Sequence, residues 1–493
     1  MADSAPVAEA LATGTLKGLP DQLFIDGAWR KARTQMESFD PGSARPYASF
    51  GLADADDVNA AVEAAHRAQF GEWRRAKPQH RCAILLKAAE LLRADAERFA
   101  VVETLDTGKT ISEARGDIQG CARMLEYYGG LADKLQGATI PLGPDYFSYT
   151  VLEPVGVTAH IIPWNYPTTT LLRGAAPALA AGCTVVAKPA ETTPFTALMM
   201  AEIFQRAGLP AGVFNVVPGI GPVAGAALVA HEKVRHITFT GSVATGIATM
   251  QAAARNVASV TLELGGKSPV IVLADADLDA AVDGIRWAIY SNAGQVCSAG
   301  SRLIVERRIH NELLDRVVTM SRGLRLGHGL RNPDIAAINS GAQLEKIGRF
   351  ADDARARGLP IATGGKPAVD PETGKGWFFE PTVIDRLPRE DRLIRDEIFG
   401  PVLVVQVAEN AEEALALAND SVFGLVAGVY TRDFARAVTL ARDLDVGQVF
   451  INEYFAGGVE VPFGGNKRSG FGREKGLEGV RAYTRVKAVA ARV

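Results

Sequence analysis

The sequence predicts an α/β protein built around parallel sheets, and two observations lead to this prediction. Between about residues 151 and 254, short β-branched runs alternate with helix-like stretches. A second stretch with the same alternation follows from about 266 to 450. Strands that alternate with helices are typical of βαβ units, whose strands pair in parallel. We therefore expect two α/β regions in this chain of 493 residues, a length sufficient for about two or three domains.

The individual elements follow from local patterns. Apolar residues recur at helical spacing between about residues 56 and 130, and Gly108 is expected to end one of these helices. The expected strands cover 155–162, 184–187, 213–217, 236–240, 269–273, 402–405, 428–430 and 448–451. Helices are expected over 196–207, 222–231 and 242–254, and from about 277. Two further strand-like pieces, 147–152 and 482–493, belong to neither alternation, and residues 1–20 are expected to form a loose extension.

Composition excludes several classes of protein. The chain is 47% hydrophobic and 22% charged, as soluble globular proteins are, and its net charge of -3 does not indicate a nucleic-acid or membrane surface. No apolar run reaches the roughly 18 residues that a transmembrane helix needs. Residues 1–20 lack the pattern of a secretory signal. Four cysteines without a CxxC pair indicate neither a disulfide framework nor a metal site, so we expect a metal-free cytoplasmic protein.

Cys297 differs from the other three cysteines in its surroundings. Cys82, Cys121 and Cys183 lie in or beside apolar runs, where a buried cysteine is usually an inert small hydrophobe. Cys297 instead lies in a segment rich in glycine, alanine and serine, where a ligand can approach the sulfur closely. The segment indicates a candidate nucleophile, with a structural cysteine as the alternative.

Expected strand ends carry residues suited to a nucleotide. Parallel sheets bind ligands at the carboxyl ends of their strands. Lys188 and Glu191 follow one such strand; a carboxylate there can accept hydrogen bonds from ribose hydroxyls and repels a 2′-phosphate, which favours NAD over NADP. Gly241 and Ser242 open a helix, whose free N–H groups suit a pyrophosphate. The glycine-rich run 218–225 lacks G-x-G-x-x-G spacing, so an ordinary turn remains the alternative there.

A series of short motifs occurs in order along the chain, at 163–167 (Pro-Trp-Asn-Tyr-Pro), 188–191, 239–242, 263–267 (Glu-Leu-Gly-Gly-Lys), 294–297, 397–401 and 462–467. Together they closely resemble the NAD(P)-dependent aldehyde dehydrogenase superfamily, from about residue 21 to the end. The resemblance implies a Rossmann-like NAD-binding domain (21–131 and 154–265), an α/β catalytic domain (266–475) and a small β oligomerisation unit (132–153 and 476–493). It also implies a homodimer or homotetramer, in which the hairpin near 132–153 pairs across subunits.

The resemblance implies a role for three residues in oxidising an aldehyde to its acid. Cys297 would add to the aldehyde carbonyl, and Asn165 would donate an N–H to the resulting oxyanion. Glu263 would activate the water that hydrolyses the thioester formed after hydride transfer to NAD. Taken alone, Glu263 also fits a solvated charge before a Gly-Gly turn, and Asn165 fits a turn residue.

The resemblance also implies contacts to ligands. The implied cofactor contacts are Ile162, Pro163, Trp164, Lys188, Glu191, Gly221, Gly225, Phe239, Gly241, Ser242, Leu264, Glu397 and Phe399. Among them, Glu397 is expected to hold the nicotinamide ribose and Phe399 to pack near the ring. The implied substrate contacts are Arg173, Tyr454, Phe455 and Phe463.

The chain departs from the family pattern at Arg173-Gly174, where many hydrolytic members carry Trp-Lys. That lysine is thought to relay protons with the carboxylate corresponding to Glu474, so Gly174 leaves Glu474 without its cationic link. Succinate-semialdehyde dehydrogenases also carry arginine at the position of Arg173, and a guanidinium matches a carboxylate bidentately. A distal carboxylate selected by Arg173 is therefore one alternative, and a structural arginine is another. For the reaction itself, the alternative is a CoA-acylating enzyme, although such members of the family typically lack the glutamate at 263.

Overall fold

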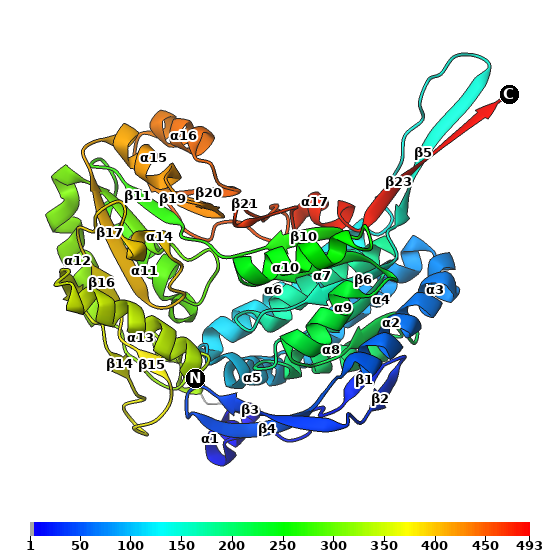
Figure 1. Cartoon of the computed structure of the whole chain (residues 1–493), viewed down its shortest axis with the longest axis horizontal. Helices are drawn as coiled ribbons and strands as arrows, with labels where there is room; N and C mark the ends of the chain where they lie inside the picture. Colours follow the sequence, from blue (N-terminus) through cyan, green and yellow to red (C-terminus); the bar gives the residue numbers. More distant parts are fainter. Residues whose placement is uncertain (1–3) are drawn as a thin grey trace.

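A computed structural model describes residues 4–493, which form two α/β domains and a projecting two-stranded ribbon (Figure 1). The first sheet has the strand order β2-β1-β8-β7-β6-β9-β10-β22. Its strands are β1 (Leu23–Ile25), β2 (Ala28–Arg30), β6 (Val157–Ile161), β7 (Thr184–Lys188), β8 (Phe214–Val216), β9 (Val234–Thr240), β10 (Ser259–Glu263) and β22 (Gly470–Phe471).

The central strands β8, β7, β6, β9 and β10 run parallel, as the alternating pattern predicts. From β6 the chain proceeds to β7 and β8 on one side and then crosses to β9 and β10 on the other. At such a reversal, the loops after the two adjoining strands diverge and leave a crevice for a ligand. The fold therefore places a binding crevice at the carboxyl ends of β6 and β9.

Helices cover both faces of this sheet. On one face, α2 (Ala55–Phe70), α9 (Ala226–Ala230) and α10 (Val243–Ala254) form a core with Val186; on the other, Val185 and Ala187 contribute to the core of α4 to α8. Neighbouring residues of β7 thus point into different cores, because side chains alternate along a strand. The second group comprises α4 (Pro78–Ala94), α5 (Ala96–Thr107), α6 (Ile111–Leu131), α7 (Pro167–Ala181) and α8 (Phe195–Arg206). As expected, α5 ends at Gly108, in a left-handed conformation.

The second domain is built on the sheet β13-β16-β17-β12-β11-β19-β20, which is parallel except for β13. Its strands are β11 (Pro269–Val272), β12 (Arg302–Glu306), β13 (Ile361–Thr363), β16 (Thr382–Ile384), β17 (Val402–Ala408), β19 (Val426–Tyr430) and β20 (Gln448–Ile451). Its longer helices are α11 (Leu278–Tyr290), α12 (His310–Arg322), α13 (Gly341–Ala356), α15 (Ala411–Asn419) and α16 (Phe434–Asp443). The two predicted α/β regions are both present.

The two strand-like pieces predicted at 147–152 and 482–493 pair with each other. β5 (Tyr146–Pro154) pairs antiparallel with β23 (Thr484–Arg492) along its whole length. Figure 1 shows this ribbon projecting away from both domains. Exposed apolar side chains lie along it, including Phe147 and Val486.

The structure differs from the sequence prediction at the amino terminus. The loose extension predicted for residues 1–20 contains helix α1 (Ala5–Thr13), and residues 1–3 lie outside the described part. Val7 and Ala10 are buried in the first core, where α1 contacts α5. Two apolar residues are too few to predict a helix from sequence periodicity. The helix is stabilised because its apolar face packs against α5.

Another difference concerns the boundary predicted at residue 475. β22 lies within the predicted catalytic region, yet it pairs with β10 of the first sheet, at Leu262 and Glu263. The segment after β20 therefore returns to the first domain before it reaches the ribbon. The strands β3 (Thr34–Asp40) and β4 (Arg45–Leu52) were not predicted either. Within the described residues, no helix has the length and apolar character needed to cross a membrane.

Candidate active site

A cavity of about 190 Å³ lies in the crevice at the carboxyl ends of β6, β9 and β10. It is lined by Pro163, Trp164, Asn165, Thr240, Gly241, Ser242, Glu263, Leu264, Gly265, Cys297, Gln343, Lys346, Glu397 and Phe399. Most of the predicted cofactor contacts and the three predicted catalytic residues therefore surround one space, although they lie far apart in the sequence. Gln343 and Lys346 were missed, because they lie on α13 outside any motif.

The other predicted cofactor residues lie at or after the ends of β6, β7, β8 and β9 without lining this cavity. Lys188 donates hydrogen bonds from Nζ to the carbonyl oxygen of Gly219, at 2.6 Å, and lies 3.7 Å from the Glu191 carboxylate. The Glu191 side chain is 40% exposed, so its carboxylate is accessible to a ligand. Gly225 lies beside the aliphatic stem of Lys188. Ile162 and Phe239 are buried, and the space around Gly221 is open.

Glu397 is held by a tight backbone turn after β10. Its Oε1 accepts a hydrogen bond from the Gly266 N–H at 2.9 Å. A Cβ atom on Gly265 would lie 2.2 Å from Oε2 of Glu397, so only glycine permits this approach. Phe399 meets Trp164 edge to face, with 5.3 Å between ring centroids. The two glycines of the 263–267 motif thus position the carboxylate that the resemblance assigns to a ribose.

Cys297 lies in a strained loop between α11 and β12. Asn292, Ala293 and Gly294 have successive φ angles of 46°, 52° and 74°, a left-handed run that costs about 1–3 kcal/mol for each residue other than glycine. The Asn292 N–H donates to Oε1 of Glu113 at 2.7 Å, and the Gln295 side chain donates to two carbonyl oxygens. These hydrogen bonds hold the loop in place, and with it the thiol.

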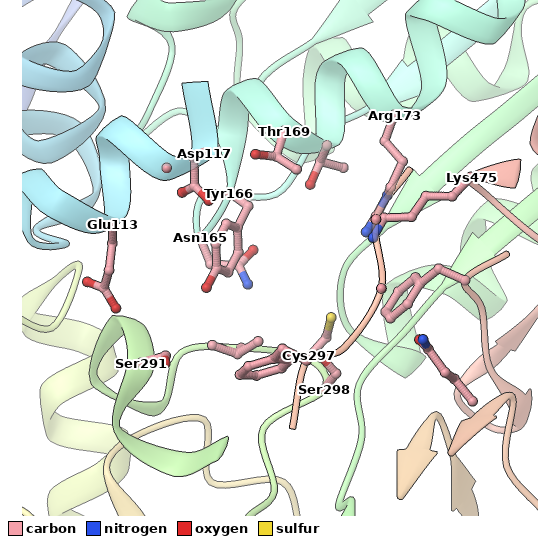
Figure 2. Close-up of a pocket in the computed structure, with 18 of the residues that line it drawn as sticks. Glu113, Asp117, Asn165, Tyr166, Thr169, Arg173, Ser291, Cys297, Ser298 and Lys475 are labelled. Atoms are coloured by element: carbon pink, nitrogen blue, oxygen red, sulfur yellow. The ribbon is translucent and has the colours of Figure 1, made fainter. Parts of the chain in front are cut away.

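The Asn165 side chain is oriented by the same loop. Its Nδ2 donates to the Gln295 carbonyl oxygen at 2.9 Å, and Nδ2 of Asn292 donates to the Asn165 backbone carbonyl at 3.1 Å. An amide has two N–H groups, so one remains available to a ligand. Figure 2 shows Asn165 and Cys297 bordering the same space. The arrangement suits stabilisation of an oxyanion formed at a carbon bonded to Sγ.

Glu263 is buried at the end of β10, and its carboxyl oxygens have no hydrogen-bond partner within residues 4–493. Burial raises its pKa well above the usual value; Glu474 raises it further, and Arg173 opposes the rise. Burial also raises the pKa of the Cys297 thiol, to about 11, against the opposing charge of Arg173. The resting thiol therefore carries its proton at neutral pH, and a base is needed to remove it.

The structure corrects the prediction that Glu474 lacks a cationic partner. The sequence predicts a carboxylate without a cationic partner, but Nε of Arg173 contacts Oε2 of Glu474 in a buried ion pair. The guanidinium also lies over the Phe463 ring, 5.2 Å from its centroid. A cation is therefore present beside Glu474, although it comes from the residue before Gly174.

The absence of a side chain at residue 174 has a local physical explanation. A Cβ on Gly174 would lie 2.5 Å from Nδ1 of His160 and 3.2 Å from the Tyr483 hydroxyl. These rings stack, with centroids 5.9 Å apart. The His160 ring thus occupies the space in which a longer side chain at 174 would begin.

A second cavity, of about 370 Å³, opens on the other side of Cys297. It is lined by Glu113, Gly116, Asp117, Asn165, Tyr166, Thr169, Thr170, Arg173, Thr240, Trp287, Ser291, Val296, Cys297, Ser298, Gln448, Phe450, Phe455, Ala456, Gly457, Gly458, Phe463 and Lys475. Three of the predicted substrate residues are among them, namely Arg173, Phe455 and Phe463. Tyr454 does not line this cavity. It is buried behind the loop that carries Cys297, where its hydroxyl donates to the Ser298 carbonyl at 3.0 Å.

Comparison with known proteins agrees with this arrangement. The model of the aldehyde dehydrogenase family matches residues 29–489. The chain is 41% identical to the betaine aldehyde dehydrogenase of Bacillus subtilis over 95% of this chain and 96% of the relative. It is also 41% identical to a hydroxyisobutyraldehyde dehydrogenase of Mycolicibacterium austroafricanum, over 96% of this chain and 94% of that protein.

A solved structure shares the whole fold. The NAD+ complex of an aldehyde dehydrogenase from Bacillus cereus matches 100% of this chain and 99% of its own, with a TM-score of 0.95 and 38% identity. The matched residues include both cavities and the thiol between them. The chain therefore belongs to the aldehyde dehydrogenase family.

Proposed function

We propose that this chain oxidises an aldehyde to its carboxylic acid with NAD as acceptor and Cys297 as nucleophile. The observation that carries the proposal is the position of Cys297, which lines both cavities. A cofactor in the smaller cavity and an aldehyde in the larger one would approach the same sulfur from opposite sides. The first domain would then hold NAD, and the second would carry the thiol.

The residues of the smaller cavity fit NAD. The Thr240 hydroxyl is buried without a hydrogen-bond partner in the described chain and lines the cavity, so it offers a polar group to a ligand. Glu191 presents an accessible carboxylate beside Lys188, which favours NAD over NADP by repelling a 2′-phosphate. The Bacillus cereus relative is an NAD+ complex. When bound, NAD would accept the hydride that leaves the carbon attached to Cys297.

Three side chains would share the chemical steps. Sγ of Cys297 adds to the aldehyde carbon as its proton passes to the ionised form of Glu263, and the Asn165 N–H donates to the oxyanion. Loss of hydride leaves a thioester on Cys297. Glu263, after releasing the first proton, removes one from water, whose oxygen attacks the thioester carbon and displaces the thiolate. The raised pKa of Glu263 suits a group that must both accept and release a proton.

The structure bears on two alternatives predicted from the sequence, namely coenzyme A as the acyl acceptor and a substrate with a distal carboxylate. Glu263 beside the thiol favours water over coenzyme A as the group that releases the acid. Selection of a distal carboxylate by Arg173 is poorly supported, because Glu474 already compensates the guanidinium. The two named relatives act on different aldehydes, so they do not single out a substrate for this chain.

Assembly into a homodimer or homotetramer is part of the proposal. In the described residues, one edge of β5 pairs with β23 and the other is bridged to residues 138–140, so β23 is the strand with a free edge available for pairing. The exposed apolar residues of this ribbon, such as Phe147, would be covered by a second copy of the chain. A cytoplasmic location stays a prediction from the cysteine content.

Rapid-mixing kinetics of two variants tests the mechanism. Cys297→Ala should abolish NADH formation, by about 10³-fold or more, because the nucleophile is lost. Glu263→Gln should form NADH in a single burst and then stall, because the thioester is not hydrolysed. Cys82→Ala, which changes a partly buried cysteine on α4, should behave like the unaltered enzyme. Full turnover in Cys297→Ala, or steady turnover in Glu263→Gln, would contradict the assigned roles.

A further inference from the structure

Lys475 is a cation in the larger cavity that has no assigned role. It follows Glu474 directly and lines the cavity, with Nζ 5.6 Å from the centroid of the Phe463 ring. Within residues 4–493, its ammonium group makes neither a hydrogen bond nor an ion pair. Figure 2 shows Lys475 and Arg173 reaching into the same end of the cavity, beside Cys297.

The other charges at this end cancel and leave the charge of Lys475 uncompensated. The guanidinium of Arg173 contacts the Glu474 carboxylate, and each neutralises the other. Glu263, the remaining acid nearby, does not line this cavity, and burial together with Glu474 raises its pKa and so disfavours its ionised form. The ammonium of Lys475 therefore gives this end of the cavity a net positive charge.

The acids at the opposite end are already occupied by protein partners. Asp117 accepts from Nζ of Lys109 at 2.6 Å, in an ion pair. Glu113 accepts from the backbone N–H of Asn292 at 2.7 Å and from Thr110. Lys109 compensates the charge of Asp117, whereas the donors to Glu113 are neutral and leave its negative charge uncompensated. The cavity therefore has an uncompensated anion, Glu113, at this end and an uncompensated cation, Lys475, at the other.

The backbone at Lys475 is strained, and hydrogen bonds on both sides hold it there. Its φ and ψ are 59° and 176°, a region that residues other than glycine rarely adopt, at a cost of about 1–3 kcal/mol. Glu474 and Phe463 exchange two backbone hydrogen bonds, and the Gly476 N–H donates to the Val459 carbonyl at 2.7 Å. This turn directs Glu474 toward Arg173 while Lys475 lines the cavity.

We propose that Lys475 binds the carboxylate of an aldehyde substrate, so that the preferred substrates are semialdehydes of dicarboxylic acids. An ammonium group that is partly shielded from water and has no internal partner attracts a carboxylate more strongly than an exposed one does. The aldehyde end would then lie at Cys297, which borders the same cavity. This inference rests on the proposed function, because it assumes an aldehyde at Cys297.

Kinetics with a matched pair of substrates tests the inference. 4-Oxobutanoate and its methyl ester have the same aldehyde and chain length but differ in charge. We expect the enzyme to prefer the carboxylate at least about tenfold in kcat/KM at pH 7. Lys475→Gln should remove this preference, mainly through the KM for the carboxylate, and Lys475→Arg should retain most of it. Lys87→Met, at an exposed position on α4, is the control and should change nothing.

The outcomes of this comparison separate three explanations. Equal losses for both substrates in Lys475→Gln would mean that Lys475 assists the chemistry, as a proton carrier would, and would overturn carboxylate binding. Equal rates for both substrates in the unaltered enzyme would overturn it as well, while leaving aldehyde oxidation intact. Inactivity toward both substrates would instead count against the proposed function.

Alkylation of Cys297 tests the inference without turnover. Iodoacetate and iodoacetamide react at the same carbon but differ in charge, and peptide mass spectrometry can follow each cysteine separately. Lys475→Gln should lower the ratio of the iodoacetate rate to the iodoacetamide rate at Cys297 about tenfold. The ratio at Cys82, measured in the same sample, should not change. An unchanged ratio at Cys297 would overturn the inference, whatever the enzyme does with aldehydes.

Discussion

The two sides of Cys297 are built in different ways. The smaller cavity is lined mainly by residues that directly follow parallel strands, so its walls come from short contiguous motifs such as 263–267. The larger cavity takes its walls from α6, α7, the loop of Cys297 and the segment between β20 and α17 (Gly476–Arg481). A site formed at strand ends can be predicted from local sequence, whereas one formed by scattered side chains cannot.

The two sides also differ in charge. The residues assigned to the cofactor include the carboxylates Glu191 and Glu397, and Glu263 lines the smaller cavity as well. The inner end of the larger cavity instead carries Arg173 and Lys475. Arg173 is bound to Glu474 and has a structural role, whereas Lys475 remains available to a ligand. The predictions below test this division of roles.

The largest effect is expected from removal of Arg173. Arg173→Met leaves Glu474 buried without its partner, which typically costs about 3–5 kcal/mol in the free energy of unfolding. Calorimetry should show a clear fall in Tm. Arg93→Met breaks an exposed pair with Glu126 and should cost under about 1 kcal/mol. If both variants have the same Tm, the buried ion pair does not stabilise the fold.

The loss of stability caused by Arg173→Met should depend on pH. The pKa of Glu474 is raised by burial in the folded chain, and the loss of Arg173 would raise it further. A carboxyl whose pKa rises on folding is destabilising above its unfolded value, and the penalty grows with pH up to its folded value. Arg173→Met should therefore be less stable at pH 8 than at pH 5, relative to the unaltered enzyme.

Asn165 is expected to affect rate rather than stability. Asn165→Ala removes one donor to the oxyanion, which typically lowers kcat by about 10²–10³-fold. The rate of Cys297 alkylation by iodoacetamide should remain within a few-fold of normal, which would show that the thiol is still in place. A loss of kcat smaller than tenfold would show that the oxyanion is stabilised elsewhere.

A smaller effect is expected at Glu191, on the cofactor side. Glu191→Gln removes the negative charge that repels a 2′-phosphate, so kcat/KM with NADP should rise relative to NAD by about tenfold, or ~1.4 kcal/mol. Glu345→Gln changes an exposed carboxylate on α13 and serves as the matched control. An unchanged NADP/NAD ratio in Glu191→Gln would place the ribose elsewhere.

The smallest effect is a pH dependence on the substrate side. Burial and the charge of Arg173 lower the pKa of Lys475 to about 8, while Glu474, Cys297 and Glu460 oppose this shift. The protonated fraction falls as pH rises through the pKa, so the preference for 4-oxobutanoate over its ester should weaken several-fold between pH 7 and pH 9. Lys475→Arg should keep the preference at pH 9, since guanidinium stays charged.

Local sequence determined much of this protein. Alternating runs predicted the two parallel sheets, because strand and helix periods are visible within a few residues. The motifs that resemble the family placed Cys297, Asn165 and Glu263 in one site, and the structure brings all three to the same cavity. Strand ends meet at one edge of a sheet, so residues far apart in the chain could be grouped in advance.

Other features were decided only by the tertiary structure. The packing of α1 against α5 depends on a surface from a distant segment, as does the pairing of β5 with β23. The ion pair between Arg173 and Glu474 joins residues about 300 positions apart, and it leaves Lys475 as the uncompensated cation. Periodicity describes which face of an element is buried, but charge compensation depends on which side chains meet across elements, and that requires the folded chain.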